Sequence, residues 1–317
     1  MNAAYLHPII MLLAAIAGLT LGSLFDCTSA SDLIEPFLMV MLFVVFMCVS
    51  IKDIGRSFSH VHFTFTTVLI NFVWTPIFAI LLGLLFADID VRIGLLMLLV
   101  TPCTDWYLVF TAAAKGNVPL SSSILPLNLI LQIVLMPVYL LIFFNTQISI
   151  DVPGLLYSMV IVLVIPLAAA IIVKALATKI GMVERFGEKV TGNGDNLQLF
   201  FLCLAIAAMF ASQSAELMNN LKLFLMLIVP LLIFFFVNYL VASGASRLQG
   251  FDRADTTSLI FTSMARNSPL SLAIAVAAFP GSTLLLLVLV IAPLIELPIL
   301  SITAGYRLRR IESNDGQ

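Results

Sequence analysis

The chain has 317 residues, of which 62% are hydrophobic and 10% charged, and its mean hydropathy is +1.15. A globular protein of this size and composition would not stay in solution, so we expect a polytopic membrane protein. The formal net charge of −2 says little about partners, because the distribution of the charges matters more than their sum, and there is no basic patch for nucleic acid. The four cysteines follow no disulfide or zinc spacing, so we expect no metal site and no cofactor.

Apolar runs long enough to cross a bilayer, at about 20 residues per span, follow one another along the chain. In chain order they cover residues 5–25, 33–51, 62–87, 93–114, 118–144, 152–177, 196–215, 220–246, 256–279 and 282–306. The first run lacks a basic n-region and a convincing cleavage site, so we expect a retained helix. The pattern predicts an all-α polytopic membrane protein with ten transmembrane helices.

The longest connection, residues 178–195, carries mixed charges and glycines. We expect residues 1–177 to hold a first repeat of helices 1–5 together with helix 6. Residues 178–195 would be a cytoplasmic connection, and residues 196–317 would hold the rest of a second repeat, helices 7–10. Because each repeat has an odd number of helices, the second must enter the membrane from the opposite side, which makes the repeats inverted.

Lysine and arginine predict the orientation. With the N-terminus in the cytoplasm, 12 of the 15 basic residues fall in cytoplasmic segments, Arg92 and Lys222 fall outside, and Arg266 lies within the membrane. This bias predicts an integral protein of the bacterial inner (plasma) membrane with both termini in the cytoplasm.

Two of the apolar runs are interrupted by polar residues and proline. The fourth contains Pro102, which removes a backbone donor, and the ionisable Asp105, and the ninth contains the sequence Arg266-Asn-Ser-Pro269. Hydrocarbon tolerates such interruptions only where protein or water supplies partners. Paired interruptions in the two halves of a chain are typical of the site of a secondary transporter, so we expect helices 4 and 9 to be discontinuous.

Asp105 and Arg266 occupy matching positions in the two interruptions. We expect the broken helices to cross near the midplane and these charges to pair, because an unpaired charge in hydrocarbon is costly. The pair could be a permanent structural salt bridge, or it could open during a transport cycle, with Arg266 facing an oxyanion. Asn71 and Asn238 also lie at matching depths, and we interpret them first as interhelical contacts and second as ligands.

The candidate binding residues gather around the interruptions and in the last helix. Cys103 could be a packing residue or a soft ligand for a thiophilic metalloid. Glu296 could be a proton relay, or it could lie solvated near the cytoplasmic end of its helix. The full candidate set for substrate and ions is Cys103, Thr104, Asp105, Asn128, Thr262, Arg266, Asn267, Ser268 and Glu296.

The residues of the first interruption and of the next helix resemble the arsenite-efflux permeases. The resemblance rests on the run Cys103-Thr-Asp-Trp-Tyr-Leu-Val-Phe110, followed by Gly116-Asn117, Leu127-Asn128, Gln132, Pro137 and Tyr139. The ten-helix plan and the second break, Arg266 to Ala275, resemble equally the related bile acid:sodium symporter family.

The chain departs from both families at positions that matter for substrate and ions. Ser271 stands where the arsenite permeases have a glutamate thought to act with the cysteine. The cation-binding positions of the sodium symporters are occupied here by Tyr107-Leu108, Thr262 and Arg266, although Asn267 and Ser121 match. A guanidinium at such a position would repel sodium, or would replace its charge.

The resemblance implies a secondary active transporter, with helices 3–5 and 8–10 as a core and helices 1–2 and 6–7 as a panel. We expect arsenite-type efflux of a metalloid oxyanion, coupled to a proton or to sodium. Ion-coupled symport of a small organic anion is the alternative, and a non-transporting receptor on the same scaffold is a third interpretation. We find no motif in which a nucleophile, a base and an orienting group converge, so we expect no enzyme.

Overall fold

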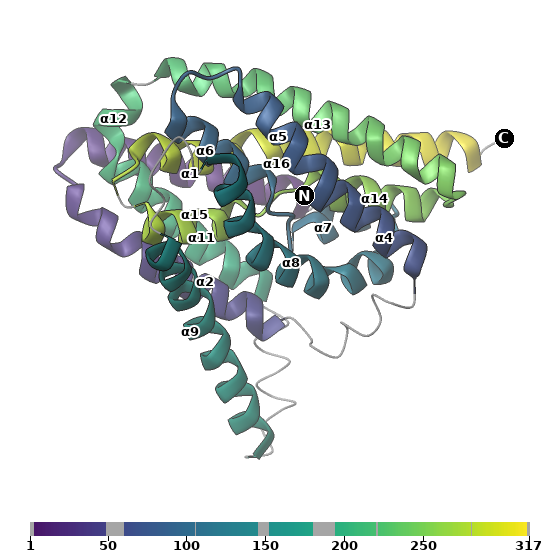
Figure 1. Ribbon diagram of the computed structural model, residues 1–317, viewed down its shortest axis with the longest axis horizontal. Coiled ribbons are helices and arrows are strands. Elements are labelled where there is room, and N and C mark those ends of the chain that lie inside the picture. The colour runs from purple at the N-terminus through teal and green to yellow at the C-terminus, as the bar shows by residue number, and fades with distance from the viewer. Residues whose placement is uncertain are drawn as a thin grey trace.

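The computed structural model describes residues 3–48, 60–104, 106–144, 152–179, 194–219, 221–279 and 281–315. Within these ranges every regular element is a helix (Figure 1). The N-terminal elements are α1 (Ala3–Leu24), the short 3-10 helix η1 (Thr28–Leu33) and α2 (Ile34–Cys48).

The next helices of the first half include one irregular turn and one break. A single long helix is made of α4 (Val61–Leu69), the π-helical turn η3 (Ile70–Trp74) and α5 (Thr75–Gly83). The broken fourth run is divided into α6 (Ile89–Leu99) and α7 (Trp106–Ala113), and α8 (Val118–Phe144) follows.

The remaining helices include a second broken pair. They begin with α9 (Val152–Lys179), α11 (Gly194–Ser212) and the short α12 (Ser214–Asn219). The long α13 (Leu221–Gln249) precedes a second broken helix, α14 (Arg253–Met264) and α15 (Ser268–Ala278), and the chain closes with α16 (Thr283–Asp315). Each apolar run predicted from the sequence therefore coincides with a helix or with a broken pair.

Several helices have the length and composition to cross a bilayer. Among the described residues these are Val61–Gly83, Val118–Phe144, Leu225–Gln249 and Thr283–Arg309. Shorter apolar helices cover Ile9–Leu24, Val164–Ala177, Asn196–Ser212 and Ser268–Ala278. A spanning helix needs about 20 apolar residues, so the long helices identify the chain as an integral membrane protein.

Both broken helices begin with the same kind of N-terminal cap. The side chain of Asp88 accepts hydrogen bonds from the backbone N–H groups of Asp90 and Val91 at the start of α6. The side chain of Asp252 accepts one from the N–H of Asp255 at the start of α14. A carboxylate at this position satisfies free N–H groups and interacts favourably with the positive end of the helix dipole. Each broken helix thus has a hydrogen-bonded cap at its N-terminus, which is the end away from its break.

The helices pack in two groups. In one group, α2 packs against α9 and α11, and α11 also packs against α1; in the other, α4 to α8 and α13 to α16 surround the breaks. The two groups meet where α15 packs against α2 and α9 and where α1 packs against α16. The contact between α1 and α11 is close because Gly18 and Gly22 lie directly on the backbone of Ala207 and Ala211. Small residues allow such an approach between membrane helices. Close packing matters there because the hydrophobic effect does not drive helices together within lipid.

We predict that Gly18→Leu separates α1 from α11. A side chain at Gly18 would collide with the Ala207 carbonyl, and overpacking of this kind costs about 1–3 kcal/mol. The apparent Tm of the detergent-purified protein should fall. The control is Gly281→Leu, between α15 and α16, where an added Cβ meets no atom within 4 Å. Equal Tm values for the two variants would contradict the close contact.

Candidate functional site

The two helix breaks cross and satisfy each other's backbone. Pro102 and Arg266 form an antiparallel bridge. On its two sides, the N–H of Cys103 donates to the Ala265 carbonyl at 3.0 Å, and the N–H of Asn267 donates to the Thr101 carbonyl at 2.7 Å. Hydrocarbon offers no partner to broken backbone, so the two interruptions depend on each other. The expectation that the interrupted segments meet is confirmed.

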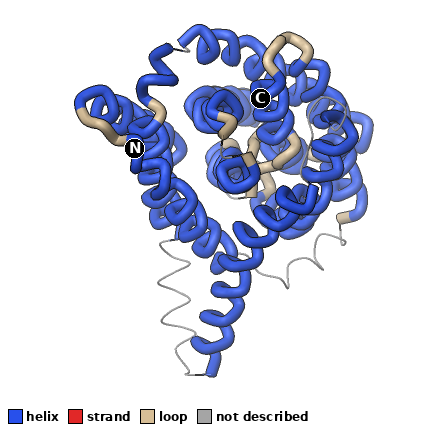
Figure 2. The backbone as a smooth tube through the Cα atoms, turned by 60° about the vertical axis from the view of Figure 1, so that its left-hand side comes forward, coloured by secondary structure: helices blue, strands red, loops and turns tan. Residues whose placement is uncertain are grey.

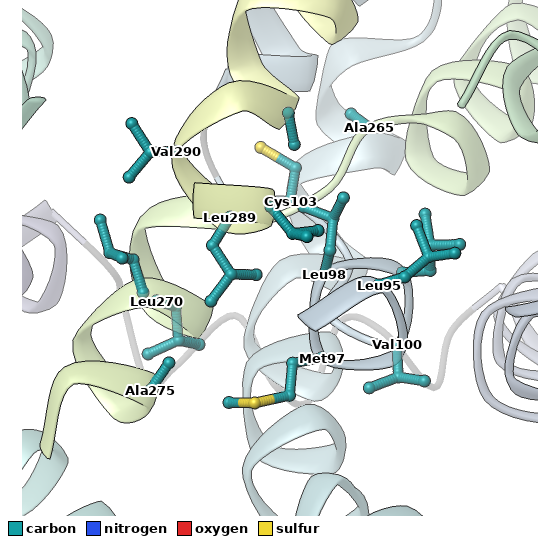
Figure 3. Close-up of a cluster of buried hydrophobic side chains, with 14 of the residues drawn as sticks. Leu95, Met97, Leu98, Val100, Cys103, Ala265, Leu270, Ala275, Leu289 and Val290 are labelled. Atoms are coloured by element: carbon teal, nitrogen blue, oxygen red, sulfur yellow. The ribbon is translucent and has the colours of Figure 1, made fainter. Parts of the chain in front are cut away.

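The crossing lies inside the protein and is surrounded by apolar side chains. Figure 2 shows loop segments enclosed by helices near the middle of the molecule. Figure 3 shows Cys103 and Ala265, one from each break, near apolar side chains of α6, α15 and α16, among them Leu98, Leu270 and Leu289. This packing excludes lipid from the polar groups of the crossing.

The guanidinium of Arg266 is buried in a cage of oxygen atoms. The side chain is 3% exposed. It donates hydrogen bonds from Nη1 to the Leu99 carbonyl (2.9 Å), from Nε to the Met264 carbonyl (3.2 Å), and from Nη2 to Asn71 Oδ1 (3.1 Å) and to the Ser263 carbonyl. Its Cζ atom also lies 5.2 Å from the centre of the Phe234 ring.

The caging carbonyls belong to the last residues of two half-helices. Leu99 ends α6, and Ser263 and Met264 end α14. The last carbonyls of a helix have no partner within the helix and carry the negative end of its dipole. Two helix C-termini therefore face one guanidinium, and the positive charge of Arg266 is stabilised by neutral oxygens. The cation–π contact with Phe234 adds to this.

The predicted ion pair between Asp105 and Arg266 is not decided by this geometry. Asp105 lies outside the described residues, so the pair stays a prediction. Within the residues that the structure does describe, each hydrogen-bond acceptor of the Arg266 guanidinium is a carbonyl or an amide oxygen.

Glu296 lies at the crossing and not at a solvated helix end. It is 4% exposed, and its Oε1 accepts a hydrogen bond from the backbone N–H of Arg266 at 2.8 Å. Pro293 and Pro298 stand on either side of it within α16. Its burial excludes the solvated helix end that the sequence left open, and the proton-relay role stays a prediction.

A small cavity of about 30 Å³ adjoins the crossing. Its walls are formed by Met11, Cys103, Leu202, Arg266, Asn267, Ser268, Pro269, Pro293, Glu296 and Leu297. One water molecule needs about 10–15 Å³ of such space, so the cavity has room for a few small polar atoms. Met11 of α1 and Leu202 of α11 come from the first helix group and the remaining residues from the second. The cavity therefore lies between the two groups of helices.

Other predicted site residues also meet here. Thr104 Oγ1 accepts a hydrogen bond from Asn267 Nδ2 at 3.2 Å, and the Asn267 side chain caps α15 by accepting from the Leu270 N–H. Ser268 Oγ donates to the Leu289 carbonyl of α16. Cys103, which is 7% exposed, lines the cavity beside them.

Three of the described candidate residues, Thr104, Thr262 and Asn128, do not line this cavity. The Thr262 hydroxyl donates to the Ser258 carbonyl of its own helix at 2.8 Å. Asn128 is completely buried on α8, and neither its amide nor that of Gln132 has a hydrogen-bond partner among the residues that the structure describes. Asn128 therefore does not belong to the cavity at the crossing. The prediction that grouped it with the crossing residues is wrong in this respect.

Asn71 and Asn238 act as interhelical contacts at matching places. Asn71 Nδ2 donates to the Thr262 carbonyl, and Asn238 Nδ2 donates to the next carbonyl, that of Ser263. The Oδ1 atom of Asn71 accepts from Arg266, whereas that of Asn238 accepts from Trp74 Nε1 at 2.9 Å. The interhelical interpretation is confirmed for both.

Sequence reasoning missed Asn71 as a partner of Arg266, and it missed Ser271. Ser271 Oγ lies 2.7 Å from Thr101 Oγ1 and donates to the Met97 carbonyl, which fastens α15 to α6. The position of Asn71 depends on a π-helical turn, for which the sequence gives no signal. The other partners of Arg266 are backbone carbonyls, which any residue type supplies.

The fold and the site together define a class of protein. Two helices broken inside a membrane protein, with their ends meeting at a buried polar cavity, form the arrangement in which secondary transporters bind substrate and ions. A profile of the Sodium Bile acid symporter family matches residues 35–220. The chain belongs to this family of membrane transporters, as its resemblance to the family indicated.

Two relatives have sequences similar to this chain. The arsenical-resistance protein Acr3 of Corynebacterium glutamicum is 23% identical over 251 residues, which cover 75% of this chain and 68% of the relative. The uncharacterized protein YbaS of Bacillus subtilis is 26% identical over 222 residues, which cover 69% of each chain. The family match and these similarities identify the chain as a transporter of the bile acid:sodium symporter and arsenite permease superfamily.

We predict that Arg266→Met destabilises the protein strongly and that Arg266→Lys recovers part of the loss. Without the guanidinium, the oxygens of its cage lose their donor, and each buried polar group left unsatisfied costs about 1–3 kcal/mol. Thermal unfolding of the purified protein would measure the effect. Arg92→Met is the control, because the Arg92 side chain has one described acceptor, the Phe86 carbonyl. If Arg266→Met is as stable as Arg92→Met, the cage does not support the fold.

Proposed function

We propose that the protein is a secondary active transporter that exports arsenite-type metalloid oxyanions, that the cavity at the crossing is its substrate site, and that the substrate binds there as the uncharged acid. The single observation behind this proposal is that the Cys103 thiol lines a buried cavity together with Glu296 and Asn267. The similarity to an arsenical-resistance protein supports the same substrate class.

The donor set suits trivalent arsenic. A thiol is a soft ligand, and soft ligands favour thiophilic elements. The hydroxyl groups of arsenous acid can exchange hydrogen bonds with Asn267, Ser268 and the Glu296 carboxyl group. A small cavity also suits a molecule with few atoms.

The hydrogen bonds that the Arg266 guanidinium already makes favour a neutral substrate over an organic anion. Four hydrogen bonds to protein oxygens use four of the five N–H groups of the guanidinium. A carboxylate substrate that paired with Arg266 would have to displace these oxygens. Arsenous acid is uncharged at neutral pH and needs no countercharge. Uptake of a small organic anion is therefore the second candidate.

We further propose a topology of ten spans in two inverted repeats, with α6/α7 and α14/α15 as discontinuous helices 4 and 9. In this proposal residues 1–177 hold the first repeat and helix 6, residues 178–195 form the cytoplasmic connection, and residues 196–317 hold the rest of the second repeat. The matching Asp88 and Asp252 caps support this division. The distribution of lysine and arginine supports an inner-membrane protein with both termini in the cytoplasm.

Alternating access in this proposal is a rocking of the two helix groups. The panel consists of α1, α2, α9 and α11, and the core consists of α4 to α8 and α13 to α16. The cavity has panel residues, Met11 and Leu202, on one side and core residues on the other. Relative movement of the groups would open the cavity alternately to the two sides of the membrane.

We propose that a proton, and not sodium, drives the cycle. In secondary transporters the C-terminal ends of half-helices coordinate the coupling cation. Here the guanidinium of Arg266 occupies the space between two such ends. A second cation at that place would be repelled at close range. Glu296, on the cavity wall, is the acid through which a proton could be taken up and released.

Arsenite export predicts that resistance depends on the Cys103 thiol. Cells that lack their own exporter should survive more arsenite when they express the protein, and Cys103→Ser should remove most of this protection at equal protein levels. Cys203→Ser is the control, because Cys203 lies on α11 and does not line the cavity. Unchanged arsenite sensitivity with the wild-type chain, together with carboxylate uptake by vesicles, would favour the organic-anion candidate.

Proton coupling predicts that transport does not require sodium. Everted vesicles should accumulate arsenite when a proton gradient is imposed, at the same rate in sodium and in choline buffers. A protonophore should abolish the uptake, and Glu296→Gln should reduce it strongly, because the glutamine side chain carries no exchangeable carboxyl proton. A rate that rises with sodium concentration would contradict the proposed place of Arg266 in the cycle.

A further inference from the structure

A second and larger cavity, of about 520 Å³, lies where α13 ends, α14 begins and α16 passes both. Figure 1 shows the C-terminal parts of α13 and α16 running to the same end of the molecule. The cavity is lined by Tyr239, Leu240, Ser243, Gly244, Arg247, Phe251, Asp252, Arg253, Thr256, Tyr306 and Arg307. It shares no lining residue with the cavity at the crossing, and its volume is typical of a ligand pocket.

The charge of this cavity is positive. Three arginines line it against one aspartate, and that aspartate, Asp252, already caps α14. Arg307 is held in place by hydrogen bonds to Thr257 Oγ1 and to the Arg253 carbonyl, whereas Arg247 and Arg253 are exposed. Arginine is the side chain best suited to bind a phosphate group with two parallel hydrogen bonds.

The interior of the cavity has unused space. An added Cβ at Gly244 would meet no atom within 4 Å, so the wall is open at that point.

The flank of the cavity is apolar and faces outward. Leu240 and Tyr306 on its wall are 51% and 53% exposed. One helical turn further into the membrane segment, Phe236 of α13 and Ile302 of α16 are 65% and 72% exposed. The Tyr239 and Tyr306 rings meet edge to face, with centroids 6.3 Å apart, and tyrosine is enriched at the membrane interface.

We propose that this cavity binds the headgroup of an anionic phospholipid, with its acyl chains along the exposed apolar flank of α13 and α16. Basic pockets between membrane helices are suited to such headgroups. The phosphate lies between Arg247 and Arg253. A free phosphate ion would use the same arginines but would leave the apolar flank without a role.

Native mass spectrometry of the full-length protein in detergent tests this proposal. Phosphatidylglycerol, phosphatidylcholine and inorganic phosphate are titrated separately. We expect a saturable phosphatidylglycerol adduct. Arg247→Gln and Arg253→Gln should each weaken it about fivefold, since one basic residue contributes about 1 kcal/mol near an anionic lipid. Gly244→Leu should abolish it by filling the cavity.

The control variant is Arg309→Gln, which removes an exposed arginine from α16 that does not line the cavity, and its adduct should match that of the wild type. Equal binding of phosphatidylcholine, or equal affinity in all variants, would overturn the proposal. If inorganic phosphate displaces the lipid and its binding also depends on Arg247 and Arg253, the cavity is a site for a free anion. That result would contradict the proposed lipid site. The measurement is of binding alone, so its outcome is separate from that of the transport experiments.

Discussion

The reciprocal backbone hydrogen bonds between the two helix breaks are the constraint on which the rest of this structure depends. Cys103 and Asn267 donate across the crossing to Ala265 and Thr101, so neither break could exist in hydrocarbon without the other. Because the breaks are joined in this way, helix ends point at one another in the interior. The half-helix C-termini face a cation, and the N-terminus of α15 lies beside the cavity.

The chain supplies that cation itself. The Arg266 guanidinium is attached to one of the two breaks, so its position is fixed by the same backbone that creates the oxygen cage. The desolvation cost of a buried charge is offset by four hydrogen bonds, by two helix dipoles and by the Phe234 ring. The hydrogen bond that the structure describes for Glu296 is not made to the guanidinium. Glu296 accepts from the backbone N–H of Arg266, which leaves its carboxyl group part of the cavity wall.

The sequence predicted the helices well because the bilayer imposes a length and a composition that can be counted. It also predicted both breaks, because Pro102 and the Arg266-Asn-Ser-Pro269 run cannot continue an apolar helix. It could not predict the partners of Arg266, since these are mostly carbonyls. The depth of Glu296 depended on a span boundary that composition does not define. Asn128 was grouped with the crossing because the sequence does not show in which direction α8 presents its polar face.

The π-helical turn at Ile70–Trp74 has a consequence for the two matching asparagines. Asn71 lies in this turn and reaches the guanidinium, whereas Asn238 lies in the uninterrupted helix α13 and contacts Trp74. The same type of side chain therefore supports a buried charge from one helix and an indole N–H from the other.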